Sequence, residues 1–166
     1  MYIKYAQLCP LMLPQKLTPQ QALPKLKKYC AYQERCHQEV LEKLYSYGVF
    51  RDDAQEIISQ LIEENYLNEE RFALHYASGK FRIKQWGKVK IKYQLKQKNV
   101  SEYCIKKALL SIDKTQYKKL LYKLADMKLA ALKSEKNIFI KKRKLQDHLL
   151  QKGFELDLVR EIVNDI

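Results

Sequence analysis

A spaced pattern of aliphatic and turn residues occurs three times along this chain and strongly limits how it can fold. In each copy two aliphatic residues stand four positions apart, a Gly or Asn follows four positions later, and an apolar residue comes directly after it. The spacing places the aliphatic side chains on one face of a helix, and Gly and Asn readily adopt the left-handed conformation that ends a helix. The pattern therefore predicts a helix that stops at a tight turn. The three copies are Val40-Leu44-Gly48-Val49, Ile91-Leu95-Asn99-Val100 and Leu145-Leu149-Gly153-Phe154.

A second helix is expected after each turn, because small or apolar residues recur six, nine and ten positions beyond it. A further helix is expected ahead of each pair, at about 19–32, 68–84 and 115–132. Units of three helices cannot bury enough apolar surface alone, so they should stack on their neighbours. The recurring positions after the turns are Ala54, Ile57 and Ile58, then Ile105, Ala108 and Leu109, then Val159, Ile162 and Val163.

The predicted fold is all-α, with three tandem three-helix repeats that form an elongated, curved array. The repeats are expected at 18–66, 67–112 and 113–166, preceded by an N-terminal arm over 1–17 that contains two prolines and has no clear period. Few residues favour turns, since the chain has only 4 Gly and 4 Pro among 166 residues.

The local sequence predicts two helix starts. Thr18 is followed by Pro19 and Gln21, which is typical of a capping box with proline at the first helical position. Asn68 is followed by Glu69 and Glu70, whose carboxylates suit the positive end of a helix dipole.

Positive charge is concentrated in the middle of the chain. The formal net charge is +13, yet residues 1–70 hold more acidic than basic side chains, whereas 71–101 hold nine basic and no acidic ones. This concentration favours a polyanionic partner such as nucleic acid, and the alternative is a solvated lysine-rich surface.

A row of lysines is expected on the helix after Gly87. Lys88, Lys92 and Lys96 are spaced four apart, and Lys84 extends the row if Gly87 does not break the helix. Since no acidic residue of the 71–101 segment offsets these charges, an anionic surface is expected to face them. The candidate residues for binding DNA or a protein partner are Arg71, Lys80, Arg82, Lys84, Lys88, Lys90, Lys92, Lys96 and, at the matching place in the third repeat, Lys141, Lys142, Arg143 and Lys144.

Aromatic residues are interleaved with this positive charge. For Phe81 and Trp86 the sequence leaves two interpretations open, packing in the core and stacking on a base.

No catalytic, cofactor or metal motif is found, and we expect a protein that is not an enzyme and has no cofactor. Cys30, Cys36 and His37 lack zinc-ligand spacing, and four cysteines are too few for a disulfide scaffold in a chain of this length. They are expected to be reduced, buried side chains. The chain shows no secretory signal or apolar run of about 20 residues, so a cytoplasmic protein without membrane contact is expected. We also expect it to be a monomer.

The central segments closely resemble the RecX regulatory proteins. The family pattern has a Leu-(Asp/Asn)-(Glu/Asp)-x-Arg-Phe-Ala segment, then a Gly followed by a basic and an aliphatic residue, then Leu-x-x-Lys-Gly, where this chain has Asn99 in place of the last Gly. The 1–17 arm has no counterpart that we can place in the family. The matching segments run from Leu61 to Ala73, from Trp86 to Ile91 and from Leu95 to Val100.

The resemblance implies a modulator of the RecA recombinase that performs no chemistry itself. RecX proteins bind the RecA–DNA filament along its groove, oppose its growth and stability, and so lower ATPase, strand-exchange and co-protease activity. Transferred to matched positions, the family pattern makes Arg71, Lys88 and Lys90 candidate contacts, and Phe72 and Gly87 structural residues.

A sequence-specific helix-turn-helix DNA-binding protein is the alternative. It predicts a recognition helix rich in Arg, Asn and Gln, usually in a dimer. The candidate helices carry lysine instead, which suits phosphates more than base edges, so non-specific binding of single- or double-stranded DNA is expected.

Overall fold

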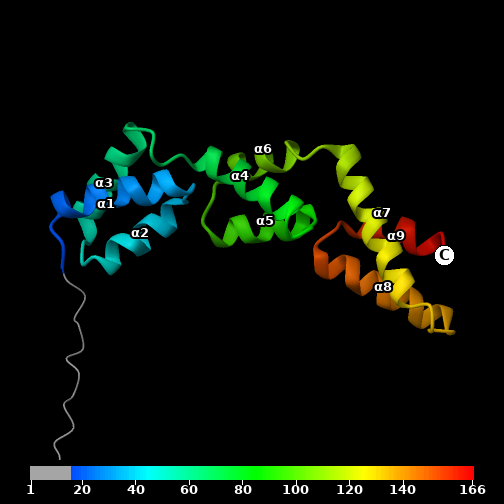
Figure 1. Cartoon of the computed structure of the whole chain (residues 1–166). Coiled ribbons are helices and arrows are strands. Elements are labelled where there is room, and N and C mark those ends of the chain that lie inside the picture. The colour runs from blue at the N-terminus through cyan, green and yellow to red at the C-terminus, as the bar shows by residue number, and fades with distance from the viewer. Residues whose placement is uncertain (1–15) are drawn as a thin grey trace, which may run out of the picture.

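A computed structural model describes residues 16–166, so most of the predicted 1–17 arm lies outside the described residues. Within 16–166 the chain forms nine α-helices and no strand, shown in Figure 1. The helices are α1 (Pro19–Tyr32), α2 (His37–Ser46), α3 (Arg51–Glu63), α4 (Glu69–Arg82), α5 (Lys88–Gln97), α6 (Glu102–Leu110), α7 (Lys114–Ala131), α8 (Ile138–Lys152) and α9 (Leu156–Asn164).

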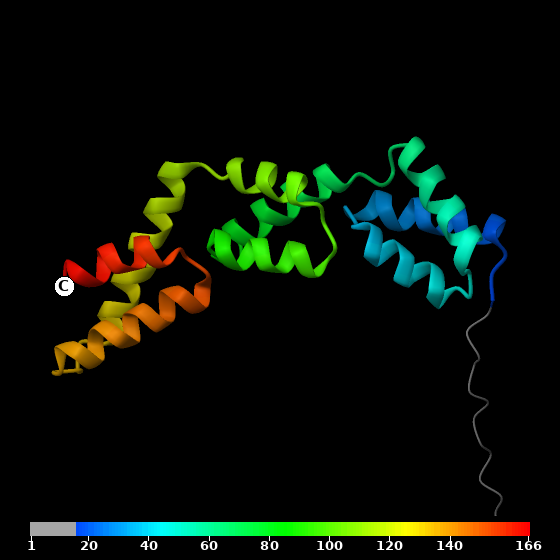
Figure 2. The same cartoon turned by 180° about the vertical axis from the view of Figure 1, so that it is seen from behind.

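The helices are arranged as three successive units, which we name repeat 1 (α1–α3), repeat 2 (α4–α6) and repeat 3 (α7–α9). The units follow one another in an elongated, curved array (Figures 1 and 2). In both views the second helix of each unit, α2, α5 or α8, lies along the same lower edge of the array. The prediction of an all-α array of three-helix repeats is confirmed.

The turn residues behave as the repeat pattern predicts. Gly48, Asn99 and Gly153 all have left-handed backbone conformations, with φ of 77°, 56° and 88°. In each turn the following apolar residue is buried, and its N–H donates to the carbonyl oxygen of the second aliphatic residue of the pattern, as Val100 does to Leu95 at 3.2 Å. The turn thus closes the helix and returns the chain to the core.

The two predicted helix starts are also present. Thr18 and Gln21 form a reciprocal capping box ahead of α1, with Pro19 at the first helical position. The Asn68 side chain accepts a hydrogen bond of 2.9 Å from the backbone N–H of Arg71 at the start of α4.

The described part of the chain contains two apolar cores rather than three. Repeat 1 has its own core around Leu26, Leu44 and Leu61. Repeats 2 and 3 share a single core, in which Phe81 of α4, Leu95 of α5 and Phe154 after α8 belong to one cluster. Repeat 1 contributes only Cys36 to that shared core. The junction between repeats 2 and 3 is therefore continuous apolar packing, and the one between repeats 1 and 2 is not.

Candidate polyanion-binding surface

The lysine row on α5 consists of the three residues that the sequence analysis places after Gly87. Lys88, Lys92 and Lys96 lie one turn apart on α5, and Lys92 and Lys96 are exposed. Lys84 lies in the connection between α4, which ends at Arg82, and α5, which begins at Lys88. Gly87 caps a new helix there, so the condition for Lys84 to extend the row, an unbroken helix, is not met.

The row also has an acidic neighbour from another helix. The Glu102 carboxylate, in the first turn of α6, pairs with Lys96 and lies 3.8 Å from the Lys92 ammonium. The hydrogen bond from Lys96, with the nearby Lys92 charge, lowers the pKa of Glu102. The expectation that nothing offsets these lysines is therefore wrong for two of the three. The four-residue turn between α5 and α6 returns the chain so that Glu102 faces the helix it follows.

Trp86 lies at the centre of a cluster of cations from two helices. The ammonium groups of Lys80 and Lys90 lie 5.1 and 4.9 Å from the centre of its ring system. Lys80 also lies over the Tyr76 ring, and Lys90 donates a hydrogen bond of 3.1 Å to the carbonyl oxygen of Gln151. Trp86 is half-buried against the shared core, and Phe81 lies within it. For both residues the structure agrees with the core-packing interpretation.

Lys88 is anchored to repeat 3 through Tyr117 of α7. The Tyr117 hydroxyl accepts a hydrogen bond of 2.9 Å from the Lys88 backbone N–H and donates one of 2.5 Å to the Glu155 carboxylate. Burial, together with the Glu155 hydrogen bond, raises the pKa of Tyr117 far above its ordinary value. The Lys88 ammonium lies 4.9 Å from the centre of the same ring, so the start of α5 is held rigidly against the third repeat.

A shallow cleft of about 450 Å³ separates α5 from α6. It combines a partly apolar floor with three lysine side chains, and one of them, Lys106, was not singled out by the sequence analysis. Lys106 is hard to identify from the sequence because it lies outside residues 71–101, the segment that contains no acidic residue. The lining residues are Lys88, Lys92, Glu102, Tyr103, Ile105, Lys106, Leu109 and Leu110.

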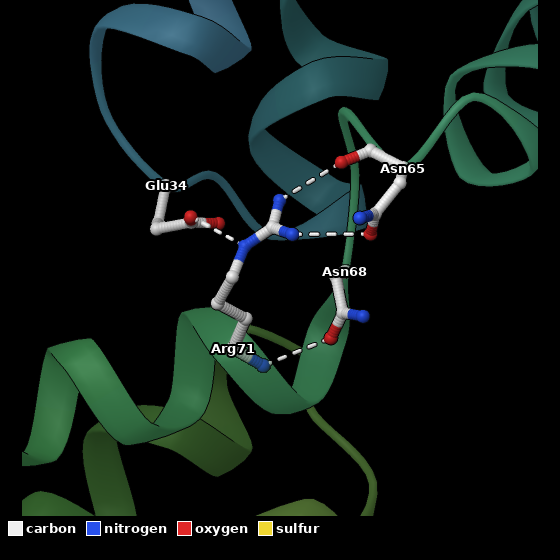
Figure 3. Close-up of polar contacts among 4 residues, drawn as sticks. All are labelled: Glu34, Asn65, Asn68 and Arg71. Atoms are coloured by element: carbon white, nitrogen blue, oxygen red, sulfur yellow. Dashed lines mark hydrogen bonds and ion pairs between the residues drawn. The ribbon is translucent and has the colours of Figure 1, made fainter.

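Arg71 joins repeats 1 and 2 (Figure 3). Its guanidinium donates to the Glu34 carboxylate at 2.5 Å, to the Asn65 side-chain oxygen at 3.0 Å and to the Asn65 carbonyl oxygen at 3.1 Å. This geometry gives Arg71 a structural role in the described part of the chain. Its predicted contact with a partner stays a prediction, for which little of the guanidinium is left available.

A second ion pair crosses the same junction. Lys98, at the end of α5, pairs with Glu39 of α2 at 2.6 Å, and neither side chain is fully exposed. Burial opposes the charge on Lys98, but the hydrogen bond to Glu39 and the negative charge of that carboxylate, with smaller contributions from Cys36 and Tyr76, together outweigh it and raise the lysine pKa. A cleft of about 520 Å³ lies between the two repeats beside these pairs, lined by residues that include Glu34, Tyr76 and Lys98.

The remaining candidates lie at two separate places. Arg82, at the end of α4, is exposed. Lys141, Lys142, Arg143 and Lys144 occupy the second turn of α8, where Lys144 pairs with Glu135 at 2.8 Å. The two helices that hold these cationic segments, α5 and α8, lie along one edge of the array (Figures 1 and 2).

Two features of residues 16–166 concern metal binding and membrane insertion. His, Cys, Asp and Glu side chains in this part of the chain do not gather in threes as a metal site would need. Over the same residues, no helix combines the length and apolar character required to cross a bilayer.

Models of a known family match two parts of the chain. Residues 68–109 match the second three-helix domain of RecX, and residues 116–163 match its third three-helix domain. Together the two matches cover more than half of the chain and coincide with repeats 2 and 3.

Curated relatives carry the same family name. The regulatory protein RecX of Clostridium botulinum is 33% identical over 79% of this chain and 61% of its own length. That of Bacillus cytotoxicus is 29% identical over 89% of this chain and 54% of its own length. The chain thus spans only 54–61% of the length of these two relatives, whereas it covers 93% of the RecX of Prosthecochloris aestuarii at 26% identity.

Solved structures agree on the fold. The crystal structure of RecX from Lactobacillus salivarius matches with a TM-score of 0.78 and 27% identity, over 89% of this chain and 95% of that one. A second RecX crystal structure matches with a TM-score of 0.79 at 22% identity, which supports the fold alone.

Proposed function

The chain belongs to the RecX family of regulatory proteins, and we propose that it binds the RecA–DNA filament and inhibits RecA activities by limiting filament growth or stability. The activities that we expect it to lower are ATP hydrolysis, strand exchange and co-protease function. We propose that it does so in the cytoplasm as a monomer and without catalysing a reaction.

The observation that carries this proposal is the shared edge of the array. The second helices of repeats 2 and 3 lie on the same side (Figures 1 and 2) and hold the two cationic segments of the chain. Several weak contacts on one rigid body act together, since the second contact becomes intramolecular once the first has formed. Such an edge suits a long polyanionic partner better than a compact one.

Within this surface we propose different roles for the candidate lysines. Lys88, Lys92 and Lys96 would contact phosphates or acidic side chains of the filament, with Glu102 as the competing internal anion. Lys80 and Lys90, which lie over Trp86, would contribute mainly to the local potential.

Titration of RecA ATPase tests the proposal. The parent protein should inhibit DNA-dependent ATP hydrolysis, and a variant with Lys88, Lys92 and Lys96 all changed to Gln should need a several-fold higher concentration. Glutamine is preferred to charge reversal, because a carboxylate beside Glu102 would add repulsion that has no bearing on partner binding.

The matched control neutralises three other lysines. Changing the exposed residues Lys118, Lys119 and Lys123 of α7 to Gln alters the net charge equally and leaves α5 and α8 unchanged. Equal inhibition by both triple variants would mean that the α5 lysines form only a solvated face. A parent protein that leaves RecA ATPase unchanged but binds one duplex sequence tightly would favour the helix-turn-helix alternative.

A further inference from the structure

The start of α8 carries an exposed apolar triplet directly ahead of its four cations. Phe139 is 81% exposed, and its neighbours Ile138 and Ile140 are 42% and 43% exposed. Figures 1 and 2 show that this end of α8 lies at the tip of the array farthest from repeat 1. We name the segment 138–144 the α8 tip. Solvent exposure of this apolar cluster is unfavourable in the isolated protein, so the tip has the character of a binding surface.

The α8 tip is held in a fixed conformation. The Asn137 side chain accepts hydrogen bonds from the backbone N–H groups of Phe139 and Ile140, at 2.9 and 3.2 Å. Glu135 accepts one from the Asn137 N–H and pairs with Lys144 at 2.8 Å. The Phe139 ring is therefore presented at a defined place on a helix, and its exposure is not that of a fraying end.

Phe139 and Arg143 lie together on this helix. They are four residues apart, which places them on the same face, and both are exposed. Among residues 16–166, no aromatic ring stacks on Phe139 and no cation lies over it, in contrast to Trp86, which two lysines cover. Phe139 thus offers the open ring face that Trp86 does not.

The charge of the α8 tip helps to decide which kind of partner it binds: a second copy of this chain, a membrane or a nucleic acid. A second copy of this chain would bring the same four cations together. A membrane surface needs an apolar stripe along an amphipathic helix, but here the exposed triplet fills only the first turn and cations follow at once. An unpaired nucleic-acid strand matches both parts, since bases stack on aromatic rings and phosphates pair with Lys and Arg. Bases in a duplex are already stacked and are not accessible in this way.

We propose that the α8 tip binds an unpaired nucleic-acid strand, with a base stacked on Phe139 and phosphates paired with Arg143, Lys141 and Lys142. The inference rests on the proposed function, because it assigns to repeat 3 a contact with a DNA strand in the filament. The tip then distinguishes unpaired from paired DNA, which lysines alone do not do.

Fluorescence anisotropy with labelled oligo(dT) of about 20 nucleotides tests the inference in the absence of RecA. We expect Phe139→Ala to weaken binding of oligo(dT) roughly tenfold and to leave binding of a duplex of equal length unchanged. Changing Lys141, Lys142 and Arg143 together to Gln should reduce the slope of log K against log salt by about 2.

The control is Leu150→Ala, on the same helix. Leu150 lies three turns after Phe139 on the same face and is also exposed, so its loss removes apolar surface without touching the tip. It should bind oligo(dT) like the parent protein. Phe139→Trp should keep the affinity for oligo(dT), and the fluorescence of the new tryptophan should be quenched when oligo(dT) binds. Circular dichroism should give the same helical content for all variants.

Four results would overturn the inference. Phe139→Ala could bind oligo(dT) as the parent does, or lose oligo(dT) and duplex equally. The parent could bind vesicles containing phosphatidylserine through Phe139 while oligo(dT) binding does not depend on that ring. Sedimentation could show a dimer that Phe139→Ala dissociates. None of these results depends on RecA, so failure of this inference remains distinguishable from failure of the ATPase titration.

Discussion

The backbone of Gly87 packs directly against the backbone of Gly153. The Gly87 N–H donates a hydrogen bond of 2.8 Å to the carbonyl oxygen of Lys152, and the Val89 N–H donates one of 3.0 Å to that of Gly153. The start of α5 is thereby bonded to the turn that ends α8. This contact explains how two separate helical units close over one apolar core.

A methyl group at this contact should destabilise the protein. In Gly87→Ala the new Cβ would lie 2.1 Å from the Gly153 carbonyl oxygen, so the backbones must separate. We expect the free energy of unfolding to fall by about 1–3 kcal/mol, the range for overpacked sites. Urea denaturation measures the change.

Gly79→Ala is the matched control. A Cβ at Gly79, in the last turn of α4, meets no atom within 4 Å, so alanine should stabilise the helix by about 0.5–1 kcal/mol. Equal unfolding free energies for the two variants would show that the Gly87–Gly153 contact does not join the repeats.

Removal of the Arg71 side chain should weaken the junction between repeats 1 and 2. Arg71→Ala leaves the Glu34 carboxylate without its cation, and the second Glu34 oxygen is already buried without a hydrogen bond. We expect a loss of about 2 kcal/mol in unfolding free energy, part of which Glu34→Gln in the same chain should restore. A double-mutant cycle by urea denaturation measures this coupling.

The same variant tests the contact predicted for Arg71 from the sequence. If its guanidinium is fully engaged between the repeats, the salt dependence of DNA binding should not change. A slope of log K against log salt that falls by about one would instead identify Arg71 as a phosphate contact.

Neutralising Glu102 should strengthen polyanion binding. Glu102→Gln releases Lys92 and Lys96 from their internal anion, and we expect several-fold tighter binding of oligo(dT) at low salt with a steeper salt dependence. Glu64→Gln makes the same charge change by breaking the Lys27–Glu64 pair in repeat 1. A similar gain in both variants would attribute the effect to net charge rather than to the α5 row.

Stability should fall as His148 titrates. Burial, with the nearby charges of Lys128 and Lys152, lowers the pKa of His148 below 6.5. The unfolded chain therefore binds the proton more readily, so the contribution to stability is complete above about pH 6.5 and is lost as the pH falls toward the lower, folded pKa. In His148→Gln the thermal midpoint should fall less between about pH 7.5 and 5.5. Parallel curves for the two proteins would contradict the assignment.

The repeat pattern predicted the fold because its signals are local. Gly48, Asn99 and Gly153 mark their turns through backbone conformation, and Thr18 and Asn68 mark helix starts through side-chain caps. Each of these signals acts within a few residues, so a single sequence contains it in full.

The candidate site was less predictable because its details depend on distant residues. The sequence gives no sign that Arg71 meets Glu34, 37 residues away, since the pair forms only when repeat 1 docks on repeat 2. The exposure of Phe139 depends on where the shared core ends. The pairing of Glu102 with Lys96 was not predicted either, although only a short turn separates the two helices.

The two cores give the array unequal stiffness. Repeats 2 and 3 share one core, whereas repeat 1 contacts them through Cys36 and through the ion pairs of Arg71 and Lys98. A protein that can bend at one junction, here the one between repeats 1 and 2, can adapt to a helical polymer whose pitch varies. Because ion pairs stabilise that junction, added salt should weaken it while leaving the shared core of repeats 2 and 3 intact.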